Sequence, residues 1–324
     1  MAPQAFTVLV TAPRLAASGA DLLAGAGARV IYLERGDEAA QVERILAREP
    51  VDAVISRTVE LPARAIASCP TLQVISKHGV GVGNIDVAAA SARGIPVYVT
   101  PGANAQSVAE MTLGLLFAAA RRIAWMDAEL RAGRWSRAQD GIELSGKTLA
   151  LAGFGQVGQR VARACQAIGM QVAAFDPALR SSPVPGVELV ASLDALLPRA
   201  DVLSLHVPLN PHTRGMLGAA QFARMPHGAI LINTARGEVV DEPALIAALR
   251  GGQLRAAGLD TMAEEPLPAG HPLAAVPNVV LTPHVGGSTP AALAAMASGA
   301  AANVLGWLQG RPVDASRCVN PEVL

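Results

Sequence analysis

The stretch Gly153-Phe154-Gly155-Gln156-Val157-Gly158 lies near the middle of a chain of 324 residues and has the spacing G-x-G-x-x-G. It follows an apolar run, residues 148–152, and opens a helix-like stretch, residues 157–168. A second apolar run, residues 171–175, then ends in Asp176. Strand, glycine turn, helix, strand and acid together form the full context of a dinucleotide-binding fingerprint.

Each glycine of the fingerprint has a physical role. Gly153 permits the tight turn, Gly155 lets the backbone approach a pyrophosphate, and Gly158 lets helix and strand pack closely. The free N–H groups at the helix N-terminus then favour phosphate groups. We also expect Gln156 and Val157, which lie between the second and third glycines, to contact the cofactor.

Asp176 indicates which dinucleotide binds. An acid at the end of the second strand accepts hydrogen bonds from both ribose hydroxyls and repels a 2′-phosphate, so the sequence favours NAD over NADP. The alternative interpretation is that Asp176 only starts a turn before Pro177.

The composition excludes several classes of partner. Hydrophobic residues make up 51% of the chain and aromatic residues only 3%, which suits buried parallel strands covered by helices. The 26 basic and 26 acidic residues cancel and form no basic block, so we expect no nucleic-acid partner. The three cysteines, Cys69, Cys165 and Cys318, form no close pair, so neither a metal site nor a disulfide is expected.

Targeting segments are also not expected. The N-terminus enters a strand at residues 6–10, without a signal-type apolar region. No apolar run is expected to approach the roughly 20 residues that span a bilayer. The sequence therefore predicts a cytoplasmic protein with no membrane partner.

The position of the fingerprint predicts two domains, because about 150 residues precede it. Short apolar runs alternate with helical stretches on both sides of it, which is typical of βα units on parallel sheets. The expected strands are residues 7–10, 30–32, 53–56, 72–76, 97–99, 148–152, 171–175, 201–205, 229–233, 256–259 and 278–282. The predicted fold class is α/β, with two doubly wound parallel-sheet domains.

Two helix-like stretches, residues 108–120 and 289–309, flank the nucleotide-binding segment and could be crossings between the domains. We therefore predict a Rossmann domain, residues 104–288, inserted into a flavodoxin-like substrate domain formed by residues 1–103 and 289–324. A cleft between two such domains is a preferred place for a small ligand.

Two strand ends carry candidates for acid–base chemistry. Arg236 lies just past the apolar run 229–233 and could hold a carboxylate through two parallel N–H bonds; the alternative is a surface salt bridge. His284 directly follows another apolar strand and could shuttle a proton if a carboxylate orients it. From the residues alone, Glu264 and Glu265 are equal candidates for that carboxylate.

A second glycine-rich stretch, His78-Gly79-Val80-Gly81-Val82-Gly83, follows a strand of the first domain. Alternating glycines predict a loop whose N–H groups converge on an anion, although a simple turn is the alternative. Arg57, Lys77 and His78 could hold a second anionic group of the ligand, such as a phosphate, sulfonate or carboxylate. His206, which follows a buried strand, could line the cofactor cleft, or it could bond to a serine or a backbone group.

Taken together, the motifs resemble the D-isomer-specific 2-hydroxyacid dehydrogenase family over essentially the whole chain. That family includes phosphoglycerate, glycerate and hydroxypyruvate, D-lactate and formate dehydrogenases. One such motif would be weak, but seven in the family's order are highly specific. The motifs are the glycine fingerprint, Lys77–Val82, Thr100–Asn104 through Ser107–Glu110, His206–Leu209 with Thr213, Asn233–Gly237, Asp260 with Glu265-Pro266, and Pro283–Gly287.

The resemblance implies an NAD-dependent oxidoreductase that interconverts a small 2-keto acid and its D-2-hydroxy acid, with phosphoglycerate dehydrogenase and hydroxypyruvate or glyoxylate reductase as the nearest activities. It implies catalytic roles for Arg236, Glu265 and His284, and it selects Glu265 because the family's acid directly precedes the proline. It also implies a homodimer joined through the nucleotide-binding domains. Arg236 and His284 are also implied to contact both the cofactor and the substrate. The remaining residues implied are His206, Val207, Pro208, Thr213, Thr234, Ala235, Asp260, Gly286 and Gly287 for the cofactor, and Gly79, Val80, Gly81 and Asn104 for the substrate.

Two departures from the family pattern stand out. The family usually has Asp where this chain has Gly83, and the chain ends at Leu324, so we expect the short form without a regulatory domain. Two alternative functions remain open. One is an NAD(H)-sensing, corepressor-like binding protein on the same fold, and the other is a dehydrogenase of the formate or phosphite type.

Overall fold

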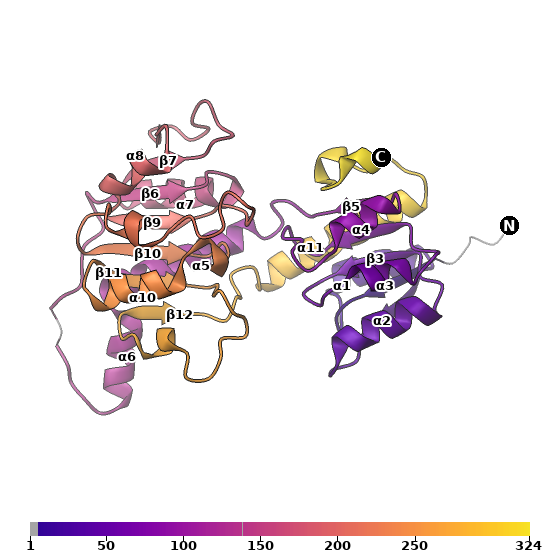
Figure 1. Ribbon diagram of the computed structural model, residues 1–324, viewed down its shortest axis with the longest axis horizontal. Coiled ribbons are helices and arrows are strands. Elements are labelled where there is room, and N and C mark those ends of the chain that lie inside the picture. The colour runs from indigo at the N-terminus through magenta and orange to yellow at the C-terminus, as the bar shows by residue number, and fades with distance from the viewer. Residues whose placement is uncertain (1–5, 138) are drawn as a thin grey trace. The chain divides into compact units, whose positions relative to one another are not determined.

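The computed structural model describes residues 6–137 and 139–324, and the chain divides into two compact units (Figure 1). The first comprises residues up to 104 together with 288–324, and the second comprises 105–287. Each unit is built on its own parallel sheet with helices on it, which confirms the predicted fold class.

The first unit has a five-stranded sheet in the order β2-β1-β3-β4-β5. This is the flavodoxin-like order, which reverses between β1 and β3. Its strands are β1 (Thr7–Val10), β2 (Arg29–Tyr32), β3 (Ala53–Ser56), β4 (Val74–Lys77) and β5 (Val97–Tyr98). Its helices are α1 (Ala17–Gly25), α2 (Glu38–Arg48), α3 (Ala63–Ala67), α4 (Val87–Ala92) and α11 (Pro290–Leu308).

Helix α11 is a core helix of the first unit. Its 19 residues make it the one helix in the described part of the chain that could cross a membrane by length and composition. The expectation that no apolar run approaches that length was therefore wrong. The helix instead packs on α1 and on the sheet, with Ala297 and Ala301 buried. Gly19 allows this contact, because a Cβ there would lie 2.6 Å from the Ala297 carbonyl oxygen.

The residues after α11 return to the edge of the same sheet. Cys318 forms an antiparallel bridge with Tyr98. The buried Asn320 side chain accepts a hydrogen bond from the Val97 N–H at 2.8 Å and donates one to the Ile95 carbonyl at 2.9 Å. These bonds fix the C-terminal segment onto β5.

The second unit has a seven-stranded sheet in the order β12-β11-β10-β9-β6-β7-β8, which reverses between β6 and β9 as a Rossmann sheet does. Its strands are β6 (Thr148–Ala152), β7 (Gln171–Phe175), β8 (Glu188–Leu189), β9 (Val202–Leu205), β10 (Ala229–Asn233), β11 (Leu254–Leu259) and β12 (Val279–Leu281). Its helices are α5 (Ala105–Arg121), α6 (Ile123–Arg131), α7 (Gln156–Ala167), α8 (Leu193–Leu196), α9 (Ala219–Phe222) and α10 (Glu242–Arg250). The sequence prediction missed β8, because two residues are too few to show a period.

The central strands of the second unit show why the sequence pattern predicted their positions. Strands β9 and β10 are buried along their whole length, since helices cover both faces of the sheet. Such strands appear in the sequence as continuous apolar runs rather than as alternating ones. The polar residues that follow them therefore gather at the carboxyl edge of the sheet, where doubly wound folds bind ligands.

Candidate active site

The glycine turn between β6 and α7 has the tight packing that its sequence predicts. Gly153 has φ +91°, and a Cβ there would lie 2.6 Å from the carbonyl oxygen of His206. A Cβ on Gly158 would lie 2.6 Å from the Gly153 oxygen. At Gly155, by contrast, a Cβ would meet no atom of the described chain within 4 Å. The N-terminus of α7 is therefore open at the one glycine that the fingerprint reserves for a pyrophosphate.

Asp176, which follows β7, contacts the glycine turn. Its carboxylate accepts hydrogen bonds from the Phe154 N–H at 2.8 Å and from the Ala178 N–H at 3.0 Å. It therefore starts the turn after β7 and also lies against the glycine turn, so the two interpretations of this residue do not exclude each other.

His206 bonds to a serine, one of the alternatives that the sequence left open. Its Nε2 lies 2.9 Å from the hydroxyl of Ser204, which is buried in β9. Burial lowers the pKa of His206 to about 4, so the ring is neutral at neutral pH. In the following loop Thr213 donates a hydrogen bond to the Pro208 carbonyl at 2.6 Å.

The turn that carries Arg236 is held by a side chain the sequence analysis did not single out. The amide of Asn233, at the end of β10, donates to the Arg236 carbonyl at 2.8 Å and accepts from the Ala235 N–H at 2.9 Å. The hydroxyl of the buried Thr234 lies 2.9 Å from that of Thr112 on α5. The backbone is fixed on both sides, while the guanidinium of Arg236 donates only to the Ala235 carbonyl among the described contacts.

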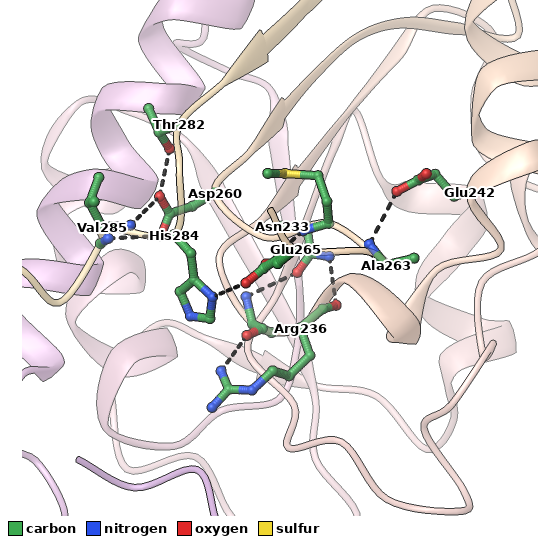
Figure 2. A network of polar contacts seen from close by, with 12 residues as sticks. Asn233, Arg236, Glu242, Asp260, Ala263, Glu265, Thr282, His284 and Val285 are labelled. Carbon is green, nitrogen blue, oxygen red and sulfur yellow. Dashed lines mark hydrogen bonds and ion pairs between the residues drawn. The ribbon is translucent and has the colours of Figure 1, made fainter. Parts of the chain in front are cut away.

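Glu265 and His284 form a direct pair, shown in Figure 2. The Nδ1 atom of His284 lies 2.6 Å from Oε2 of Glu265, and the other carboxylate oxygen accepts the Met262 N–H at 3.0 Å. Both side chains are partly exposed, at 44% and 34%. With Nδ1 held by a carboxylate, Nε2 is the nitrogen left to exchange a proton with a bound molecule. This geometry separates Glu265 from Glu264, which the residues alone did not.

Asp260 shapes the turn that presents His284. Its carboxylate, 2% exposed, accepts hydrogen bonds from the Thr282 hydroxyl at 2.6 Å, the Val285 N–H at 3.0 Å and the Gly286 N–H at 2.8 Å. His284 takes a left-handed backbone conformation in this turn, with φ +52°. The Asp260 side chain therefore acts on its own chain, and a place beside the cofactor stays a prediction.

In the first unit, the glycine loop is bonded differently from expectation. The Gly79 N–H donates to the Thr100 hydroxyl at 3.0 Å, and the Gly79 carbonyl accepts from the Thr100 N–H at 2.8 Å. The Gly79 amide is thus engaged by the chain itself. Within residues 6–137 and 139–324, no hydrogen bond is formed by the N–H groups of Val80 and Gly81. These two groups remain for an anion.

The ammonium of Lys77 anchors this loop rather than lying open to a ligand. It donates to the Arg57 carbonyl and to the Asn84 side chain, and the residue is 8% exposed. Asn84 in turn donates to the Val59 carbonyl at 2.7 Å. The loop is therefore anchored next to Gly83, although the Asp that the family usually has there is missing.

The two other basic residues of this region differ in charge. Burial, together with the nearby Arg57, lowers the pKa of His78 to about 4, so its ring is neutral. Arg57 lies in a cavity of about 390 Å³ where β1 and β3 end, lined by Thr11, Ala12, Pro13, Glu38, Arg57, Thr58 and Val59. Burial and the cation of Arg14 lower the pKa of the Arg57 guanidinium, which forms no ion pair with any described residue.

Asn104 is the last residue of the first unit before α5. Its side chain forms no hydrogen bond with any other described residue.

Comparisons with known proteins identify relatives of this chain. Residues 113–286 match the family model described as D-isomer specific 2-hydroxyacid dehydrogenase, NAD binding domain. A hydroxypyruvate reductase of Thermotoga maritima is 44% identical over 74% of this chain and 79% of its own length. The TT0316 protein of Thermus thermophilus has a crystal structure that superposes with a TM-score of 0.87 at 38% identity, covering 97% of this chain and 100% of that one.

Longer relatives also match. A D-3-phosphoglycerate dehydrogenase of Methanocaldococcus jannaschii is 45% identical over 73% of this chain but only 45% of its own length. The chain thus spans about half the length of the curated phosphoglycerate dehydrogenases that it matches.

Proposed function

The chain belongs to the D-isomer-specific 2-hydroxyacid dehydrogenase family, and we propose that it interconverts a small 2-keto acid and its D-2-hydroxy acid with NAD. The observation that carries the proposal is the 2.6 Å contact between His284 and Glu265 on the loops next to Arg236. An imidazole held by a carboxylate can transfer a proton to or from a carbonyl oxygen. An arginine beside it can bind the carboxylate that neighbours this carbonyl.

The residues of the second unit fit the dinucleotide. The open N-terminus of α7, with Gly155, Gln156 and Val157, suits the pyrophosphate, and Asp176 suits the ribose. When bound, the nicotinamide supplies or accepts the hydride. The tie of Asp176 to the glycine turn supports NAD over NADP, because a 2′-phosphate would meet this carboxylate.

Three residues of the second unit carry the proton chemistry. Arg236 binds the substrate carboxylate and polarises the C2 carbonyl. Protonated His284 gives its Nε2 proton to the developing alkoxide, while Glu265 stabilises the imidazolium through Nδ1. In the oxidation direction neutral His284 accepts the proton from the hydroxyl.

Oxidation of NADH in the presence of a panel of keto acids tests this function. Glyoxylate, hydroxypyruvate, phosphohydroxypyruvate and sulfopyruvate are compared at equal concentration, and turnover of at least one is expected. A sensor protein would bind NADH without oxidising it. A dehydrogenase of the formate or phosphite type would instead reduce NAD with those donors and ignore the panel.

Arg57 supports a substrate with a second anionic group. Of the three basic residues that the sequence pointed to, Lys77 is bonded to the chain and His78 is neutral, so Arg57 with Arg14 is the cationic pair that remains. Arg57→Ala is expected to raise KM for the charged keto acids by about tenfold or more and to leave hydroxypyruvate nearly unchanged. Arg44→Ala, an exposed arginine on α2, is the matched control. A preference for uncharged, long-chain keto acids would reject this assignment.

We also propose a cytoplasmic homodimer joined through the second unit. Four large apolar side chains on and after α5 and α6 are exposed: Phe117, Ile123, Leu130 and Trp135, the last at 78%. Exposed apolar side chains of this size mark a protein interface, and the resemblance to a dimeric family makes a second copy the expected partner. Light scattering is expected to show a dimer for the wild type and a monomer for the double variant Leu130→Asp/Trp135→Glu.

A further inference from the structure

A second carboxylate–imidazole pair, Glu242 and His271, contacts the loop that carries Glu265. Glu242 is the first residue of α10, and its Oε1 lies 3.0 Å from Nε2 of His271. Its other oxygen accepts the N–H of Ala263 at 3.2 Å, as drawn in Figure 2. The side chains of Glu242 and His271 are only 12% and 18% exposed, so both are much less accessible than the Glu265–His284 pair.

The hydrogen bonds of His271 define how it acts on Glu242. Its Nδ1 accepts the Leu273 N–H at 3.3 Å, so Nδ1 carries no proton and Nε2 donates to Glu242. Both oxygens of Glu242 therefore have a donor from the surrounding chain, one from the His271 ring and one from the Ala263 backbone. The carboxylate is held in one orientation.

Glu242 and Glu265 are bonded to successive amides of one loop. The Met262 N–H donates to Glu265 and the next N–H, of Ala263, donates to Glu242. On a third side the same segment rests on Gly237, where no side chain would fit. A displacement of Ala263 must therefore move the Met262 amide, and with it the carboxylate that holds His284.

We propose that Glu242, held by His271, is a positioning residue for the Glu265–His284 pair. It contacts no reacting atom and acts through the Met262–Ala263 backbone. This inference rests on the proposed function, because it assigns Glu242 to the same proton transfer. The charged groups on the loops around His284 include Asp260, Glu264, Glu265 and Arg236, and of these Glu265 contacts the ring while Asp260 bonds to the backbone of the same turn. Glu242 therefore acts on His284 through the position of Glu265.

The test compares four variants with the wild type in keto-acid reduction by NADH. Glu242→Ala is expected to lower kcat by about tenfold to a hundredfold with little change in KM, because the shift is in the catalytic pair and not in substrate binding. The alkaline midpoint of its pH profile is expected to move to lower pH, since the imidazolium loses part of its stabilisation. Glu242→Gln keeps an oxygen for the Ala263 N–H but turns its NH2 group toward the His271 Nε2–H, so it is expected to recover part of the turnover lost in Glu242→Ala.

Glu264→Ala is the matched control, because Glu264 is an exposed acid on the same loop. It is expected to behave as wild type in kcat, KM and pH profile. His271→Ala removes the second donor but keeps the Ala263 contact, and a smaller change in the same direction is expected. Thermal unfolding and NADH binding show which variants are folded.

Wild-type kcat and pH profile in folded Glu242→Ala would overturn the inference, as would equal losses in Glu242→Ala and Glu264→Ala. If Glu242→Ala does not fold, His271→Ala decides: a folded variant with wild-type kinetics overturns the inference. A wild-type protein that reduces no keto acid overturns the proposed function and this inference with it. An active wild type with an equally active Glu242→Ala overturns the inference alone.

Discussion

Gly237 packs so closely on the carbonyl group of Met262 that a Cβ at residue 237 would lie 1.9 Å from that carbonyl carbon. This contact joins the turn after β10, which carries Arg236, to the loop after β11, which carries Glu265. Both partners are backbone atoms, so no side-chain rotation can relieve an added methyl group. The spacing between the two loops therefore depends on the absence of a side chain at residue 237.

Gly237→Ala is expected to destabilise the protein and to impair turnover. Forcing the two loops apart costs about 1–3 kcal/mol of unfolding free energy, and it moves Arg236 away from the Glu265–His284 pair. Chemical denaturation and steady-state kinetics measure the two effects. Gly114→Ala is the control, since a Cβ at Gly114 in α5 meets nothing within 4 Å. Equal behaviour of the two variants would contradict the packing argument.

His284→Ala is expected to lower turnover by about a hundredfold to ten-thousandfold while NADH binding stays near wild type. The reason is that the ring at the end of the Glu265 contact donates the proton, while the glycine turn and Asp176 supply most of the contacts that hold the cofactor. Stopped-flow kinetics and a fluorescence titration with NADH separate these quantities. Near wild-type turnover on the best substrate would remove His284 from the mechanism.

Asp176→Asn is expected to raise the ratio of kcat/KM for NADPH to that for NADH by about tenfold or more. The substitution keeps the size of the side chain and removes the charge that repels a 2′-phosphate. Asp194→Asn, an exposed acid of the same unit paired with Arg224, controls for the change in net charge. If the ratio is the same in both variants, Asp176 does not select the cofactor.

The unfolding free energy is expected to fall as the pH drops from about 6.5 to about 4. The pKa values of His78 and His206 are lowered to about 4 by burial, so the unfolded chain binds more protons than the folded one in this interval. Each ring contributes on the order of 3 kcal/mol across it. Denaturation at pH 7 and pH 4.5 measures the loss, and His206→Gln is expected to reduce it. His227→Gln, at an exposed histidine, is expected not to.

Much of the fold could be predicted from the sequence because the signals are local. A strand buried on both faces is a continuous apolar run, and residues 148–152, 171–175 and 229–233 were predicted with their observed bounds. The short β8 escaped because its residues carry no pattern, and α11 was underestimated as an apolar segment.

The features of the candidate site differ in whether the sequence alone could predict them. Residue types, spacing and resemblance were enough to establish the glycine turn, the fold class and the family, because turn glycines and strand ends are set by neighbours in the chain. The resemblance already selected Glu265 over Glu264, but the three-dimensional packing was needed to show the contact of Glu265 with His284, that Lys77 anchors its own loop, and that Glu242 contacts Ala263. Those contacts join residues 7 to 21 positions apart through turns and neighbouring strands. Their partners depend on how β4, β10, β11, β12 and the loops after them pack, which no local pattern records.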